Sequence, residues 1–198
     1  MNRYSLPDLP YNYGALEPHL SEEQLKIHHD KHHKAYVDKA NKLLRSLAKA
    51  REDNSDVDMK AMLKSLSWNI GGHVLHSLYW ENLTGDGNSS PKGTLKEEII
   101  KEFGSFERFK KEFTQAAKSV EGSGWAALTY CKKTKGLKLM QIEKHNTNIM
   151  PMFAIVLVLD MFEHAYYIDY QNEKAGYIDA FWDMVDWQKV NDRLEEAM

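Results

Sequence analysis

The chain has 198 residues, of which 42% are hydrophobic and 28% charged, and it contains only 11 glycines and 5 prolines. These proportions exclude a disordered, collagen-like or low-complexity chain and predict a globular protein. The 26 basic and 29 acidic residues leave a net charge of -3 and are intermingled, so we expect no nucleic acid partner.

We expect neither a membrane span nor export. The longest apolar run, residues 149–159, contains Pro151 and is shorter than the roughly 20 residues that cross a bilayer. The start of the chain, MNRYSLPDLP, has no apolar run that could serve as a secretory signal. Cys131 is the single cysteine, so no intrachain disulfide can form. The expected location is the cytoplasm.

Two long helices are predicted in the first part of the chain. Apolar and aromatic residues recur at helical spacing over residues 21–51 and again over residues 57–83, with a short polar run between them. The two helices should therefore form a hairpin. Gly71 and Gly72 lie inside the second helix, where each costs about 1 kcal/mol relative to Ala. This cost indicates that another group closely approaches the backbone there.

The rest of the chain mixes helices and strands. After a glycine-rich loop, residues 84–93, the pattern predicts two helices that end at the glycines of residues 122–124. It then predicts three strands, at residues 125–131, 137–142 and 152–159, followed by helices at 160–172 and 177–187.

The predicted fold class is therefore α+β. A long N-terminal helical hairpin is followed by a C-terminal part with a three-stranded antiparallel sheet and several helices. We expect two domains, an N-terminal helical-hairpin domain at residues 1–84 and a C-terminal α/β domain at residues 94–198.

Histidines recur at helical spacing in both predicted long helices. In HHDKHH and the residues after it, His28, His32 and Tyr36 share one face of the first helix. In GGHVLH, His73 and His76 are three residues apart on the second helix. Taken alone, each set is more often a group of histidines satisfied by packing and hydrogen bonds than a set of metal ligands.

Asp160 and His164 form a sharper candidate, because they follow directly after the third, buried strand. A carboxylate at such a position is costly unless it is paired or bound to a metal. One histidine from each long helix together with Asp160 and His164 would give three imidazoles and one carboxylate. This set suits iron, manganese or zinc, and the pattern alone does not choose among them.

Other familiar sites do not fit the spacing. No histidine has a glutamate three residues before it, which excludes the paired Glu-x-x-His sites of di-iron bundles. The chain also contains neither an HExxH helix nor a glycine-rich phosphate loop.

Six segments occur in an order that resembles one family. They are LPDLPYNYGALEPH, HHDKHHKAYV, GGHVLHSLYWENL, FGSFERFKKEF, GSGWAAL and DMFEHAYYIDYQN. Together they resemble the iron/manganese superoxide dismutases, of archaeal type, from about residue 6 to residue 187. The resemblance implies a mononuclear centre with one iron or manganese ion per chain, iron being preferred, and it selects His76 over His73. The implied metal ligands are His28, His76, Asp160 and His164.

The resemblance also implies roles around the metal. His32 and Tyr36 resemble the pair that guards the substrate funnel, and Trp80 and Trp125 resemble part of an aromatic wall. Phe162 and Ala127 stand where many members of the family have other residues, which leaves the tightness of that wall open. Gly72 cannot supply the glutamine by which many members contact metal-bound solvent. His145 occupies the region from which archaeal-type members offer a histidine, although it could equally be an exposed residue at a strand end.

The implied function is disproportionation of superoxide to dioxygen and hydrogen peroxide, for which zinc is unsuitable because it has no redox chemistry. The alternative is a noncatalytic mononuclear metal-binding module. Glu163, His164 and Tyr167 resemble residues of a two-fold interface, so a homodimer or homotetramer is expected.

Overall fold

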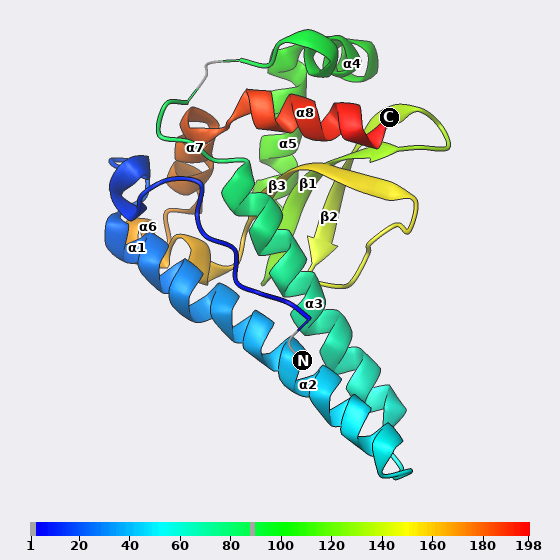
Figure 1. Ribbon diagram of the computed structural model, residues 1–198. Coiled ribbons are helices and arrows are strands. Elements are labelled where there is room, and N and C mark those ends of the chain that lie inside the picture. Colours follow the sequence, from blue (N-terminus) through cyan, green and yellow to red (C-terminus); the bar gives the residue numbers. More distant parts are fainter. Residues whose placement is uncertain (1–2, 88–89) are drawn as a thin grey trace.

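Two long helices lie side by side and project from the rest of the molecule (Figure 1). The structure is a computed structural model that describes residues 3–87 and 90–198. Asn88 and Ser89 of the expected boundary loop, and residues 1–2 of the expected first domain, lie outside the described residues. The α+β fold class is confirmed, with a helical hairpin followed by a three-stranded antiparallel sheet and further helices.

The first arm of the hairpin contains α1 (Glu22–Ile27), a π-helical turn η2 (His28–His33) and α2 (Lys34–Glu52). Its start is set by Ser21, whose hydroxyl accepts a hydrogen bond from the backbone N–H of Gln24 at 3.1 Å. The second arm is α3 (Met59–Glu81), which begins where the Asp58 carboxylate accepts from the Ala61 N–H.

The HHDKHH segment is the π-helical turn, which the sequence spacing did not predict. The N–H of Lys34 bonds to the carbonyl of His29, five residues earlier, so the register of the following helix is shifted. Such turns are rare and occur mostly at functional sites.

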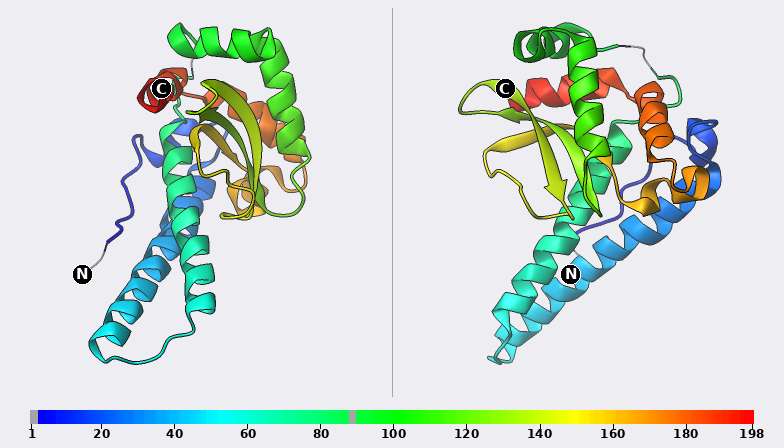
Figure 2. Two further views of the ribbon diagram at one scale, coloured as in Figure 1. Left: turned by 90° about the vertical axis from the view of Figure 1, so that its right-hand side faces the viewer. Right: turned by 180° about the vertical axis from the view of Figure 1, so that it is seen from behind.

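The sheet has the strand order β2-β1-β3, with both pairs antiparallel. Its strands are β1 (Gly124–Cys131), β2 (Gly136–Glu143) and β3 (Phe153–Asp160). Every residue of the central strand β1 is buried. Figure 2 shows why, because the sheet lies between α3 on one side and α5 (Phe106–Lys118) on the other. The helix α4 (Gly93–Phe103) precedes α5 and packs against the end of the chain.

The chain after the sheet differs from the prediction. Asp160 does not begin a helix, because it pairs with Trp125 as the last residue of β3. Only a short 3-10 turn η3 (Glu163–Ala165) and α6 (Tyr167–Tyr170) follow it. The predicted helix at 177–187 corresponds to α7 (Lys174–Met184), which ends three residues earlier, and a further helix, α8 (Trp187–Ala197), was not predicted. They are separated because the Asp186 carboxylate caps the N–H groups of residues 188 and 189.

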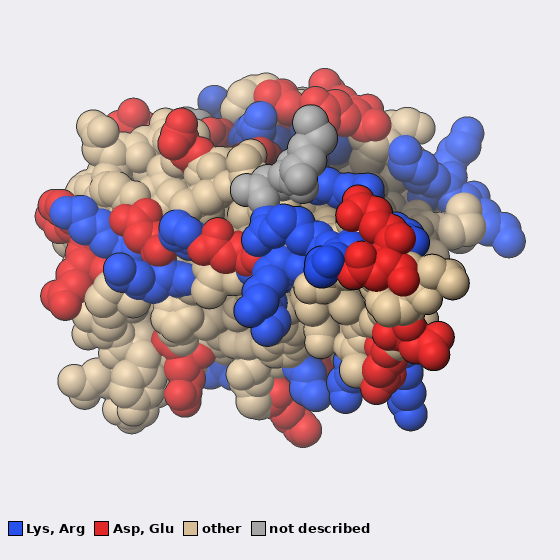
Figure 3. All heavy atoms as spheres, turned by 60° about the horizontal axis from the view of Figure 1, so that its bottom comes forward, with Lys and Arg blue, Asp and Glu red and all other residues tan. Residues whose placement is uncertain are grey.

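Acidic and basic side chains are interspersed on the face drawn in Figure 3. Oppositely charged side chains also pair along α1 and α2 with a spacing of four residues, such as Lys26 with Glu22 and Lys34 with Asp38. Such exposed pairs contribute little to stability. Among the described residues, no helix has both the length and the apolar content needed to cross a membrane.

The end of α3 is fastened to the C-terminal part through Asn82. Its side-chain oxygen accepts from the N–H of Val158 in β3 at 3.2 Å, and its carbonyl accepts from the N–H of Asp186 at 3.0 Å. Asn82 is fully buried, so neither contact is replaced by water without rearrangement.

We therefore expect Asn82→Ala to lower the free energy of unfolding by about 1–3 kcal/mol, because the buried Val158 N–H loses its acceptor. Urea unfolding followed by circular dichroism measures this change. The exposed Asn172→Ala is the matched control and should unfold like the parent. Equal midpoints for all three proteins would contradict this role of Asn82.

Candidate metal centre

Four side chains from four different elements converge at the base of the hairpin. They are His28 of η2, His76 of α3, Asp160 at the end of β3 and His164 of η3, and one ligand atom of each lies within 4.8 Å of all the others. Asp160 Oδ2 lies 3.1 Å from Nε2 of both His28 and His164, and 3.5 Å from Nε2 of His76. The structure thus brings together the four residues that the sequence analysis combined, whereas His73 is not among them.

The imidazole of His76 is oriented by its own helix. Its Nδ1 donates to the carbonyl of Gly72 at 2.6 Å, which leaves Nε2 as the unprotonated, ligand-type nitrogen of the neutral ring. His76 is fully buried, and within the described chain its Nε2 has no hydrogen-bond partner. A buried nitrogen of this kind requires an explanation, and a metal ion provides one.

Asp160 is fully buried at the centre of the group. Burial by itself would raise the pKa of its carboxyl group, but the contacts with His164 and His28 outweigh burial and hold the pKa well below its usual range. Its second oxygen, Oδ1, accepts from the N–H of Phe162 at 2.9 Å. Asp160 is therefore an ionised carboxylate in a position without water.

His145 is fully buried, so its interpretation as an exposed strand-end residue is wrong. The indole N–H of Trp125 donates to Nδ1 of His145 at 3.1 Å, and the ring stacks on Phe162 with 4.4 Å between centroids. Burial lowers the pKa of His145 to about 4. Because Nδ1 accepts, the neutral ring carries its proton on Nε2, which has no partner among the described residues.

The close approach predicted at the paired glycines is confirmed. A Cβ on Gly71 would lie 2.3 Å from the carbonyl oxygen of His145, and one on Gly72 would lie 2.8 Å from the ring of Tyr36. Glycine at these two positions therefore lets both side chains reach the site.

His32 and Tyr36 lie at the partly exposed side of the group. His32 stacks on His164 with 4.4 Å between ring centroids, and Tyr36 lies 5.2 Å from His76 and 4.7 Å from His145. Burial, reinforced by the charge of Asp160, raises the pKa of the Tyr36 phenol. The phenol is therefore protonated at neutral pH.

An aromatic wall surrounds the group, as expected for Trp80 and Trp125, which are both buried. Phe162 is also buried and stacks on His164 at 4.9 Å as well as on His145, so the departure at this position leaves no opening there. Ala127 is fully buried within β1.

Sequence reasoning missed Trp68 and Gln24. Trp68 lies edge-on to His145 at 4.6 Å, and its spacing of four residues to Gly72 and eight to His76 could have revealed it. Gln24 clamps the turn that carries His164: its side-chain N–H donates to the His164 carbonyl at 2.7 Å, and its oxygen accepts from Ile168 N–H. No local signal distinguishes Gln24 from an ordinary residue of a first helical turn.

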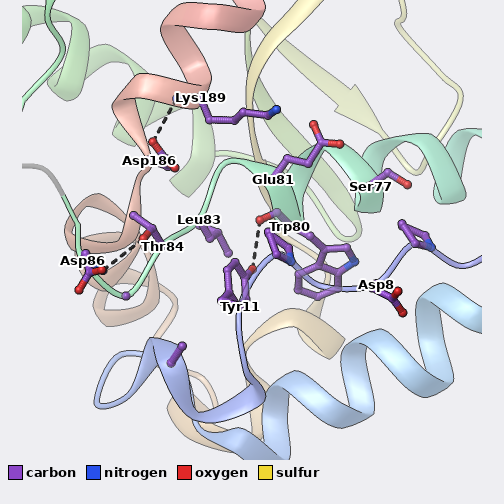
Figure 4. Close-up of a pocket in the computed structure, with 14 residues that line it drawn as sticks. Asp8, Tyr11, Ser77, Trp80, Glu81, Leu83, Thr84, Asp86, Asp186 and Lys189 are labelled. Atoms are coloured by element: carbon purple, nitrogen blue, oxygen red, sulfur yellow. Dashed lines mark hydrogen bonds between the residues drawn. The ribbon is translucent and has the colours of Figure 1, made fainter.

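The distances from the Asp160 carboxylate oxygen to the three imidazoles fit ligands of one transition-metal ion. Two ligand atoms that each lie about 2.1 Å from an ion, at roughly 95–120° from one another, are about 3.1–3.6 Å apart, which agrees with the distances around Asp160. Three neutral imidazoles and one carboxylate form a ligand set of borderline softness. The site thus defines a mononuclear metal centre of the three-histidine, one-carboxylate class. The cavity of about 610 Å³ in Figure 4 is separate, because none of these four residues lines it.

Comparison with known proteins identifies the family. The alpha-hairpin domain of the iron/manganese superoxide dismutases matches residues 3–84, and the C-terminal domain of those proteins matches residues 91–193. The chain belongs to the iron/manganese superoxide dismutase family.

Curated relatives match over nearly their whole length. An iron superoxide dismutase of Methanothermobacter thermautotrophicus is 58% identical, over 98% of this chain and 96% of that protein. The iron superoxide dismutase of Pyrobaculum aerophilum is 46% identical over 99% of this chain and 94% of its own. A manganese/iron superoxide dismutase of Aeropyrum pernix is 42% identical over 99% of this chain and 92% of its own. The archaeal-type resemblance is thereby confirmed.

The buried histidines predict how the metal-free protein responds to acid. Burial lowers the pKa of His28 to about 4 and that of His33 to about 3, whereas a histidine of an unfolded chain titrates near 6.5. As pH falls below about 6.5, the unfolded state binds more protons than the folded state, so folding stability falls. Between pH 7 and pH 5 we expect a loss of about 2 kcal/mol for each such histidine. Urea titrations at several pH values test this, and constant or rising stability would contradict it.

Proposed function

We propose that the protein is a superoxide dismutase that works at one iron or manganese ion held by His28, His76, Asp160 and His164. The observation that carries this proposal is the unpaired, buried Nε2 of His76, which faces the carboxylate of Asp160 together with two further imidazoles. Two superoxide ions and two protons give one dioxygen and one hydrogen peroxide.

The ion would supply one-electron redox chemistry, taking an electron from one superoxide and giving one to the next, which zinc cannot do. Iron is the preferred ion, because several relatives carry iron in their names. Three neutral imidazoles and one carboxylate leave a bound divalent or trivalent cation with net positive charge, so the site attracts an anion.

The substrate reaches the centre from the side of His32 and Tyr36. These two residues, with His164 and Trp68, are partly exposed, whereas His28, His76 and Asp160 are buried. The rings of His32 and Tyr36 border this proposed route to the metal centre, so a small anion should enter more easily than a larger molecule.

Two groups can serve the protons that the reaction consumes. The Tyr36 hydroxyl remains protonated at neutral pH because burial raises its pKa, so it can donate a hydrogen bond to the incoming anion. Nε2 of His145 is a second buried donor, fixed by the hydrogen bond from Trp125 to Nδ1. Each donor would orient the bound anion and stabilise its negative charge.

We also propose a homodimer through the turn that follows β3. Tyr167 and Ile168 are 49% and 44% exposed there, directly beside His164, and Glu163 is exposed next to them. A symmetric contact at this turn would bring the two metal centres to one interface. We place the protein in the cytoplasm, since Cys131 is a free, buried thiol.

Removal of one ligand should release the metal. We expect Asp160→Ala or His76→Ala to bind iron more than about tenfold more weakly and to lose superoxide consumption. Metal analysis of the purified proteins, paired with an assay of superoxide decay, measures both effects. His19→Ala, outside the group, is the control, and full metal and activity in Asp160→Ala would refute the ligand assignment. Metal without any superoxide consumption in the parent protein would instead support the noncatalytic module.

Tyr36→Phe should keep metal content and fold while slowing the proton-consuming reduction of superoxide. This difference should persist from neutral into mildly alkaline pH, because burial raises the pKa of the Tyr36 phenol and the parent keeps that proton there. Pulse-radiolysis kinetics of the parent and the variant across pH compare the two. Superimposable profiles would show that the Tyr36 hydroxyl takes no part in proton supply.

The proposed interface predicts that the protein sediments as a dimer or larger at micromolar concentration. Glu163→Ala and Tyr167→Ala should shift it toward the monomer, because both side chains lie on the proposed contact. An active monomer of the parent protein in analytical ultracentrifugation would exclude this interface.

A further inference from the structure

Three histidines of the HHDKHH and GGHVLH segments remain without a role in the proposed function, namely His29, His33 and His73, and the last two form a pair. The structure places them in contact: Nε2 of His33 lies 2.8 Å from Nδ1 of His73, and the two rings stack with 5.1 Å between centroids. His33 is fully buried in η2, and His73 is half-buried on α3.

The direction of the hydrogen bonds follows from the indole of Trp80. An indole N–H can only donate, and Trp80 Nε1 lies 3.0 Å from Nδ1 of His33, so this nitrogen accepts and carries no proton. The neutral His33 ring therefore carries its proton on Nε2, which donates to Nδ1 of His73. The result is a directed chain of hydrogen bonds from Trp80 through His33 to His73.

This chain supports the two metal-site histidines of the hairpin. The Trp80 ring lies edge-on to His28, with 4.6 Å between centroids. The His33 ring stacks over His76 at 5.3 Å and an interplanar angle of 23°. Rotation of Trp80 would remove its contact with His28, and rotation of His33 would remove its contact with His76.

Trp80 also borders the cavity of about 610 Å³ shown in Figure 4, together with Tyr11, whose hydroxyl donates to the Trp80 carbonyl at 3.1 Å. The indole thus has this polar cavity on one side and His28 on the other. If the indole moved, His28 would lose the ring that lies between it and this cavity.

We propose that His33 and His73 are positioning residues that lock the Trp80 indole against His28 and thereby slow the loss of the metal. The proposal rests on the metal site of the proposed function. His73 acts as the terminal acceptor of the chain, so its Nδ1 is the atom that matters, not its volume or its charge.

The test compares two substitutions at position 73 in the iron-loaded protein. Asn presents an acceptor oxygen close to the place of Nδ1, whereas Leu fills similar space without an acceptor. The rate of iron release to excess bipyridine under reducing conditions is measured for the parent, His73→Asn and His73→Leu. We expect release from His73→Leu to be at least about tenfold faster than from the parent, as for other residues that support metal ligands. His73→Asn should stay close to the parent.

Equal release from the parent and His73→Leu would overturn the proposal, as would equally fast release from the Leu and Asn variants. If His73→Leu does not fold, the same comparison is made at the next link, with His33→Asn and His33→Leu, and the same two outcomes decide. Failure of the proposed function is distinguishable, because it would appear as a parent protein that consumes no superoxide whatever its rate of iron release.

Discussion

The carboxylate of Asp160 is a negative charge that is wholly removed from water, and much of the architecture around it serves to make that burial tolerable. Burial lowers the pKa of His28 and of His76, so these two imidazoles stay neutral and do not balance the charge by protonation. A metal cation does so, and its binding energy becomes part of the folding energy. The backbone N–H of Phe162 and the clamp formed by Gln24 fix the carboxylate and its neighbour His164 in advance, so that little has to move when the cation binds.

Aromatic side chains surround the proposed metal ligands. Tyr36 and Trp125 lie against His76, Phe162 lies against His164, and Trp80 lies against His28. Each of the three proposed imidazole ligands therefore has an aromatic neighbour. In such surroundings a hydrogen bond has few competitors, so a single donor such as Nε2 of His145 has a defined orientation. The same density explains the glycine pair on α3, since any side chain there would displace Tyr36 or the His145 backbone.

The sequence was sufficient for the hairpin, the sheet and the four converging residues, because these depend on patterns that persist over many residues or on motifs in fixed order. The sequence was insufficient where a single hydrogen bond determines whether a segment continues as a strand or a helix. The sequence pattern predicts that a helix begins at Asp160, but its pairing with Trp125 makes it the last residue of β3. The helix expected at 177–187 ends at Met184, and the Asp186 carboxylate then starts a further helix that was not predicted. The π-helical turn and the contact of His33 with His73 depend on packing between distant segments, which spacing within one helix does not encode.

The order of the proposed ligands along the chain has a consequence for synthesis. His28 and His76 belong to the hairpin, whereas Asp160 and His164 arrive only after the sheet has been made, with the last of them at residue 164 of 198. A nascent hairpin therefore offers two of the four proposed ligands but not the carboxylate of Asp160, a partial set that holds a divalent ion more weakly than the complete one. The complete ligand set exists only when β3 and the turn after it have joined the hairpin, so tight metal binding at this site follows assembly of the sheet.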